Sequence, residues 1–237
     1  MSKHVAILII GSLFWSEQEP RPAWRRHRLD IERRTRVRVP IRYGRKTTTS
    51  GYTMVLSTEL RTAQFGVALA VPCRAAVDTF EQLNKEAEAL WAAEATKKTK
   101  KKQSADRRVT SSWGAVGLLA NPNRSGLDSL VAEWSSRVSA ERDKYREFPC
   151  LSSAVSSNGL LTIPWPVTES GDVLDCDFIL ATPTEPTPKS GPYATPPQIA
   201  ASYLEAKGGR GYFDKTRGAG ISTAFDDDIR KCLDSTG

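Results

Sequence analysis

Histidine is almost absent from this sequence: His4 and His27 are the only two among 237 residues. A metal site built from several histidines is therefore excluded, and a Ser-His-Asp triad would have to use one of these two side chains. His27 lies within Arg25-Arg26-His27-Arg28, where neighbouring positive charges disfavour its protonation. We therefore expect that any chemistry of this chain needs no histidine, no metal and no cofactor.

Cysteines and long hydrophobic runs are also scarce. Cys73, Cys150, Cys176 and Cys232 are scattered, with no Cys-x-x-Cys pair. This spacing argues against a zinc site or a disulfide scaffold and is typical of buried thiols in a reducing compartment. No apolar run approaches the roughly 18 residues of a membrane-spanning helix, and residues 5–10 lack the length and cleavage site of a signal peptide. We therefore expect a cytoplasmic protein with no membrane segment.

Negative charge is scarce in the first half of the chain. Residues 1–120 contain 22 lysines and arginines against 11 acidic residues, whereas the remainder contains 12 against 16. Such asymmetry indicates contact with nucleic acid or attraction of an anionic small molecule. The lysine block Lys97–Lys102 contains no aromatic residue that could stack on bases. We expect a mobile basic loop near 96–109 that makes at most a weak nucleic-acid contact.

An apolar run, Val5–Ile10, stops abruptly at Gly11-Ser12, and Leu13-Phe14-Trp15 follows. A short, mostly β-branched run cut off by glycine predicts a strand buried on both faces. Backbone N–H groups of the small-residue turn can then meet an anion or a carbonyl oxygen. The alternative is that Gly11 only lets the chain turn.

Three more strands are predicted in the first third of the chain. Residues 35–43 alternate apolar and arginine side chains, which indicates a half-exposed strand, and Pro40 places it at an edge or a bulge. The arginine row is either a solvated face or an anion-binding face. Residues 52–57 and 65–71 form the next strands, and the short links favour a mostly antiparallel, strongly curved sheet.

The remaining pattern predicts a single α+β domain over residues 1–237. Its sheet, or small barrel, is flanked by helices, with a proline-rich arm near 182–197. Glycine-rich stretches at 208–211 and 218–220 are expected to be turns. Helices are expected over 23–32, 74–95, 127–145, 199–206 and 226–233, and late strands over 111–120, 160–163 and 176–181.

The predicted helix over 74–95 carries two candidate acid-base groups. Glu94 follows Leu90 and Trp91 by one turn, at the end of the apolar stripe, whereas Glu86 lies at its side. A carboxylate in that position is partly desolvated, which raises its pKa and suits it to proton transfer. The alternative is a helix-end glutamate that reaches solvent. Both glutamates remain candidates.

Four features, in this order, resemble the γ-glutamylcyclotransferase-like family. A core strand runs into Ile10-Gly11-Ser12-Leu13, and a strand at Gly66–Val71 precedes a long helix. That helix ends in the pattern Leu90-x-x-x-Glu94. A proline-rich arm with a tyrosine, 186–193, precedes a helix near the C-terminus. The predicted helix 127–145 would be an insertion into that fold.

The resemblance implies an enzyme that cyclises a γ-glutamyl group to 5-oxoproline and releases an amine or amino acid, with no cofactor. It implies that Glu94, or else Glu86, transfers the proton. It also implies that substrate is bound by Gly11, Ser12, Leu13, Phe14 and Tyr193.

Two other hypotheses stay open. The same fold could serve a non-catalytic protein that binds a small anionic ligand or a protein partner. Alternatively, the basic N-terminal half could make the chain a nucleic-acid-associated accessory protein.

Overall fold

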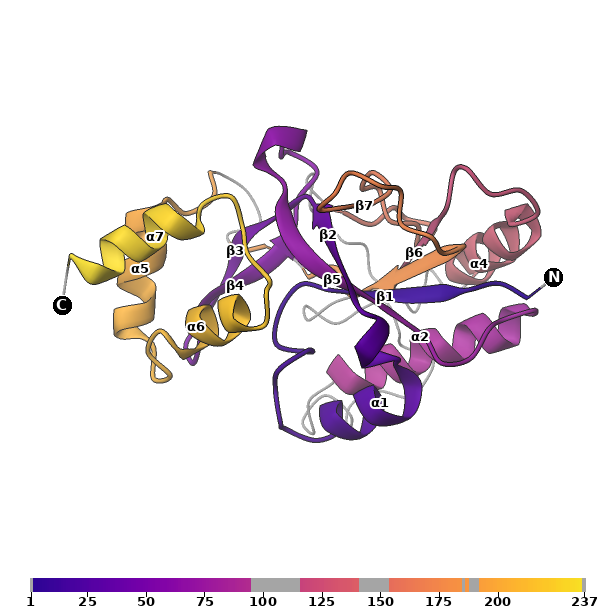
Figure 1. The fold of residues 1–237 in the computed structure, drawn as a ribbon, viewed down its shortest axis with the longest axis horizontal. Helices are drawn as coiled ribbons and strands as arrows, with labels where there is room; N and C mark the ends of the chain where they lie inside the picture. The colour runs from indigo at the N-terminus through magenta and orange to yellow at the C-terminus, as the bar shows by residue number, and fades with distance from the viewer. Residues whose placement is uncertain (1, 95–115, 141–153, 185, 188–191, 236–237) are drawn as a thin grey trace.

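The computed structural model describes residues 2–94, 116–140, 154–184, 186–187 and 192–235 of an α+β protein (Figure 1). The predicted basic loop at 96–109 lies outside the described residues. So do the first part of the predicted strand 111–120, the end of the predicted helix 127–145 and part of the proline-rich arm.

The main sheet has six strands in the order β6-β8-β1-β5-β2-β7 and is strongly curled, as a half-barrel. At its centre, β1 (Val5–Ile9) is antiparallel to β5 (Gly66–Pro72) and parallel to β8 (Phe178–Ala181). The other described pairings of this sheet, made by β2 (Thr35–Val39), β6 (Gly117–Ala120) and β7 (Val167–Thr168), are antiparallel. All five residues of β1 are buried, which confirms the prediction of a strand covered on both faces.

Pro40 divides the strand that the sequence predicts over 35–43. β2 ends at Val39, and β3 (Ile41–Thr47) pairs instead with β4 (Gly51–Leu56) in a separate two-stranded sheet. Proline has no N–H to donate to a ladder, so the chain leaves the first sheet at this residue. Its carbonyl oxygen accepts the Ser57 N–H at 2.8 Å. The predicted alternation survives the break, since Val37, Val39, Ile41 and Tyr43 are all buried.

Two helices lie side by side below the sheet in Figure 1: α1 (Arg21–Arg28) and α2 (Phe80–Glu94). α1 starts two residues before the helix that the sequence predicts over 23–32, and it ends four residues before that helix does. A short 3₁₀ turn, η1 (Ile31–Arg33), follows it. α2 begins six residues later than predicted, because Thr79 and Gln82 form a capping box. The Gln82 N–H donates to Thr79 Oγ1 (3.4 Å), and the Thr79 N–H donates to Gln82 Oε1 (3.1 Å). The predicted inserted helix is present as α4 (Asp128–Ala140).

The β3–β4 hairpin and three helices form the left side of the molecule in Figure 1: α5 (Pro196–Glu205), α6 (Gly211–Gly218) and α7 (Asp226–Asp234). The rings of Tyr43, Tyr203 and Phe213 pack together with centroids 5.8–6.2 Å apart. α6 has no counterpart among the predicted helices, and it includes Gly211 and Gly218, which were predicted to lie in turns. The predicted late strand over 160–163 makes only isolated bridges.

Candidate functional site

A cavity of about 80 Å³ opens where β1 ends. β1 and β8 are parallel, so the residues that follow them, Gly11–Leu13 and Thr182, meet at the same edge of the sheet. Glu94, the last residue of α2, and Tyr212 of α6 also line this cavity. Residues that are far apart in the chain therefore share one small, concave site.

Glu94 is held by two partners on the cavity wall. Its Oε2 lies 3.0 Å from Arg21 Nη2, and its Oε1 accepts a hydrogen bond from Thr182 Oγ1 at 3.2 Å. Burial raises the pKa of the Glu94 carboxyl, and this effect is opposed by the Arg21 charge and by the Thr182 hydrogen bond. About a quarter of the Glu94 side chain remains accessible, at 25%. Glu94 is therefore a titratable group facing the cavity.

Arg21 connects the carboxylate to the turn after β1. Its Nη1 donates to Ser12 Oγ at 3.0 Å, and its Nε donates to the Ala93 carbonyl oxygen at 3.3 Å. One planar guanidinium thus spans the end of α2 and the turn. Sequence reasoning missed Arg21, because it begins α1 beside a run of other arginines and has no distinguishing spacing.

The turn itself presents unused backbone donors. Its carbonyl oxygens at Gly11 and Ser12 accept the N–H groups of Phe14 and Ser16, at 3.2 and 2.9 Å. Across the described chain, however, no acceptor is present for the N–H groups of Gly11, Ser12 or Leu13. Consecutive N–H groups without partners on a cavity wall are suited to binding an anion or a carbonyl oxygen.

Tyr212 lines the cavity beside the turn. A Cβ at residue 11 would collide with the Tyr212 hydroxyl oxygen, so only glycine fits here. The same oxygen accepts the Met54 N–H at 3.3 Å. Burial, with the nearby Glu94 charge, raises the pKa of Tyr212 to about 12. The hydroxyl therefore keeps its proton at neutral pH and can donate it to a ligand. This tyrosine was also missed, because its helix was not predicted.

Glu86 lies elsewhere on α2 and does not line the cavity. Its side chain is 5% exposed and its Oε1 lies 3.1 Å from Arg28 Nη1. Burial raises the pKa of Glu86, and the Arg28 charge opposes this shift. The pair links α2 to the end of α1, away from the turn at Gly11.

Two other predicted site residues also lie outside the cavity. Phe14 packs under the Arg34 guanidinium, 5.8 Å from the ring centroid. Tyr193 stacks on the Arg42 guanidinium, 3.8 Å from the ring centroid. The structure therefore brings Gly11, Ser12, Leu13 and Glu94 together and leaves Phe14, Tyr193 and Glu86 apart from them.

Over the described ranges, no group of three or more histidine, cysteine or acidic side chains is arranged to hold a metal ion. No helix in those ranges is long and apolar enough to cross a membrane.

Comparison of the chain with protein-family models, with characterised proteins and with solved structures finds no match.

Proposed function

We propose that the cavity beside Gly11–Leu13 is the active site of a γ-glutamylcyclotransferase-like enzyme. The observation that supports this most is the position of Glu94: its carboxylate lines the same cavity as the turn whose N–H groups have no described acceptor. The proposed substrate is a small γ-glutamyl amine or γ-glutamyl peptide.

In the proposed reaction, the substrate's α-ammonium group gives a proton to Glu94, and the resulting amine attacks the γ-carbonyl carbon of the same molecule. A new C–N bond closes the five-membered ring, and the bond from that carbon to the original amine breaks. Glu94 passes this proton to the leaving amine. The new ring nitrogen then carries one proton too many, and Glu94 transfers that proton to the released amine as well, so 5-oxoproline and the amine in its ammonium form result. Because both reacting groups belong to one molecule, the protein mainly has to hold them in the reactive geometry.

Oxyanion stabilisation in this scheme comes from donors of the turn and of Tyr212 beside it. The N–H groups of Gly11, Ser12 and Leu13 and the Tyr212 hydroxyl are fixed before the substrate binds. Such preorganised donors stabilise negative charge as it develops on the carbonyl oxygen. Arg21 keeps Glu94 oriented and opposes the rise in its pKa.

The proposed role of Glu94 sets the direction of the pH dependence. The base must be ionised to accept the ammonium proton, and the pKa of Glu94 is raised above its ordinary value. Turnover should therefore fall as the pH decreases through this raised pKa, at a higher pH than an ordinary glutamate would give.

The Arg21–Glu94 ion pair also favours a second candidate, a binding protein without catalysis. A carboxylate already held by an arginine at 3.0 Å and by Thr182 is well satisfied without a substrate. In that case the turn would bind an anionic ligand and Glu94 would only position Arg21.

The test supplies a panel of γ-glutamyl amines and dipeptides and measures 5-oxoproline. Glu94→Gln keeps the size of the side chain but removes the titratable oxygen, so kcat should fall by about 10²–10⁴-fold. Glu86→Gln is the matched control on the same helix, and it should retain wild-type turnover. Gly11→Val should abolish ligand binding, because its side chain would meet the Tyr212 hydroxyl.

Two results would contradict the proposal. Turnover that survives Glu94→Gln would move the proton transfer to another residue. The second result is that no substrate is turned over, while the wild type and Glu94→Gln still bind the ligand and Gly11→Val does not. That result would identify a binding protein.

A further inference from the structure

Arg42, on β3, packs its guanidinium against two aromatic rings. Its guanidinium carbon lies 3.8 Å from the ring centroid of Tyr193 and 5.7 Å from that of Phe225. These side chains come from three separate places: β3, the segment that precedes α5, and the residue that precedes α7. Neighbouring Ile41 and Tyr43 point to the opposite, buried side of the strand.

No hydrogen-bond or ion-pair partner of this guanidinium is found in the described part of the chain, although the charge of Glu59 acts on it. Arg42 makes no hydrogen bond or ion pair there, and its Nε is buried without an acceptor. Burial lowers the pKa of Arg42, but an arginine remains charged at any physiological pH. Stacking uses the face of a guanidinium and leaves the N–H donors that lie in its plane. The Nε–H is covered, so the Nη groups are the donors that a ligand would reach.

The strand is shaped to receive the Tyr193 ring. A Cβ at Gly44 would lie 2.9 Å from Tyr193 Cε1 and would also collide with Val55 Cγ2. The Thr187 N–H donates to the Gly44 carbonyl oxygen at 2.7 Å, which joins the segment before α5 to the strand. Glycine at this position therefore allows the ring to lie beside Arg42.

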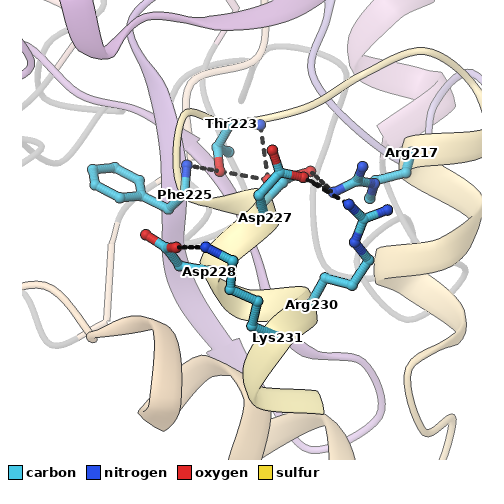
Figure 2. A network of polar contacts seen from close by, with 8 residues as sticks. Arg217, Thr223, Phe225, Asp227, Asp228, Arg230 and Lys231 are labelled. Carbon is cyan, nitrogen blue, oxygen red and sulfur yellow. Dashed lines mark hydrogen bonds and ion pairs between the residues drawn. The ribbon is translucent and has the colours of Figure 1, made fainter. Parts of the chain in front are cut away.

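The other ring is fixed by the cap of α7, which Figure 2 shows. The Phe225 N–H donates to Thr223 Oγ1 at 3.2 Å, and the ring points away from the pair between Arg217 and Asp227. Asp228 pairs in turn with Lys231 at 3.1 Å. The carboxylates of this cap are therefore engaged with other cations, and none of them is bonded to Arg42.

We propose that Arg42, Tyr193 and Phe225 form a binding site for an oxyanion, a carboxylate or phosphate group of a ligand, distinct from the Glu94 cavity. An oxyanion is the chemical match for a planar, charged set of donors, and a charge-assisted hydrogen bond is strongest where the donor is partly desolvated. The rings hold the guanidinium in one orientation, so little side-chain freedom is lost when the ligand binds.

The test titrates the full chain with inorganic phosphate or with acetate, against sodium chloride at matched ionic strength. Nuclear magnetic resonance follows the Arg42 Nε–Hε signal and the ring protons of Tyr193 and Phe225. We expect a saturable shift with at least one of the two anions. Arg42→Lys keeps the charge but loses the planar donors, so the affinity should fall by about tenfold or more. Arg38→Lys, on the preceding strand β2 of the other sheet, is the matched control and should bind like the wild type.

The anion that produces the shift identifies the group that the site prefers. No saturable shift with either anion, or an equal shift in Arg42→Lys, would overturn the proposal. If Arg42→Lys does not fold, Tyr193→Leu replaces it, because it removes one stacking face and leaves the guanidinium. It should also weaken binding, and unchanged affinity in that variant would contradict the site.

Discussion

The two glutamates of α2 differ in what faces their carboxylates. Glu94 looks into a cavity and shares its oxygens between Arg21 and Thr182. Glu86 is almost fully covered and contacts Arg28, whose own side chain is 44% exposed. A raised pKa is therefore a functional indication only for Glu94, because only that carboxylate can reach a ligand.

The raised pKa of Glu86 has a consequence for stability. Below its ordinary pKa, Glu86 is protonated in both the folded and the unfolded chain. Between that value and the raised folded pKa, the unfolded chain loses the proton first, so Glu86 lowers the free energy of unfolding as the pH rises. Glu86→Gln removes this loss of stability, and its amide oxygen can still accept a hydrogen bond from Arg28. The difference in Tm between Glu86→Gln and the wild type should therefore increase from pH 4 to pH 7, as measured by thermal unfolding.

The opposite trend would be a Tm of Glu86→Gln that falls relative to the wild type as the pH rises. It would show that the ion pair with Arg28 affects the pKa of Glu86 more than burial does. Glu88→Gln, two residues towards the C-terminus on the same helix, serves as a control for removing one negative charge from α2.

The sequence predicted the turn and the glutamate of the candidate site, but not the residues that surround them. The turn at Gly11–Leu13 and the helix-end Glu94 could be found because a strand end and a helix end are visible in the spacing of apolar residues. Arg21 and Tyr212 could not, since they reach the cavity only through the packing of α1 and α6. Tyr193 was expected at the site from the resemblance, yet Gly44 allows it to stack on Arg42 instead.

At the level of elements, α2 is the helix that carries Glu94, and its first turn depends on Thr79. The Thr79 hydroxyl accepts the Gln82 N–H, and Gln82 Oε1 accepts the N–H groups of Asp78 and Thr79. Thr79→Ala should cost about 1 kcal/mol and lower the Tm by roughly 2–4 °C. Thr79→Ser, which keeps the hydroxyl, should stay close to wild type.

Enzymatic turnover, if present, should change little in Thr79→Ala, because the cap and Glu94 are at opposite ends of the helix. An unchanged Tm in this variant would show that packing of α2, rather than its cap, determines where the helix begins.

The spacing of apolar residues predicted β1, β4, β5 and α2, because each is a long or strongly apolar segment. It did not predict short elements whose conformation depends on packing against their neighbours. α6 has eight residues, and it is helical because Tyr212, Phe213 and Thr216 are buried against the hairpin and the turn after β1. The break at Pro40 was visible in the sequence, but the change of sheet that it produces was not.

At the scale of the whole molecule, positive charge is concentrated in residues 21–46, which contain 11 arginines and lysines and two acidic residues. Part of this charge is already neutralised, since Arg21, Arg28 and Arg36 pair with carboxylates. We expect weak binding to heparin that falls steeply between about 50 and 200 mM salt. Deleting Lys97–Lys102 should reduce this binding and leave the Tm nearly unchanged, as measured by heparin chromatography and thermal unfolding.

Retention that is independent of salt, or a large drop in Tm on deletion, would contradict this expectation. The matched control replaces the five lysines of the block by serine at constant length, which separates the effect of charge from that of chain length.

The central place of β1 also matters while the chain is being made. One edge of β1 pairs with β5, which ends at residue 72, but the other edge pairs with β8, which ends at residue 181. At ordinary translation rates, roughly 10–30 seconds separate the synthesis of β1 from that of β8. For that time, a nascent chain carries a wholly apolar strand, Val5–Ile9, with an open edge. We therefore expect expression of this protein to depend on chaperones that bind emerging strands on the ribosome.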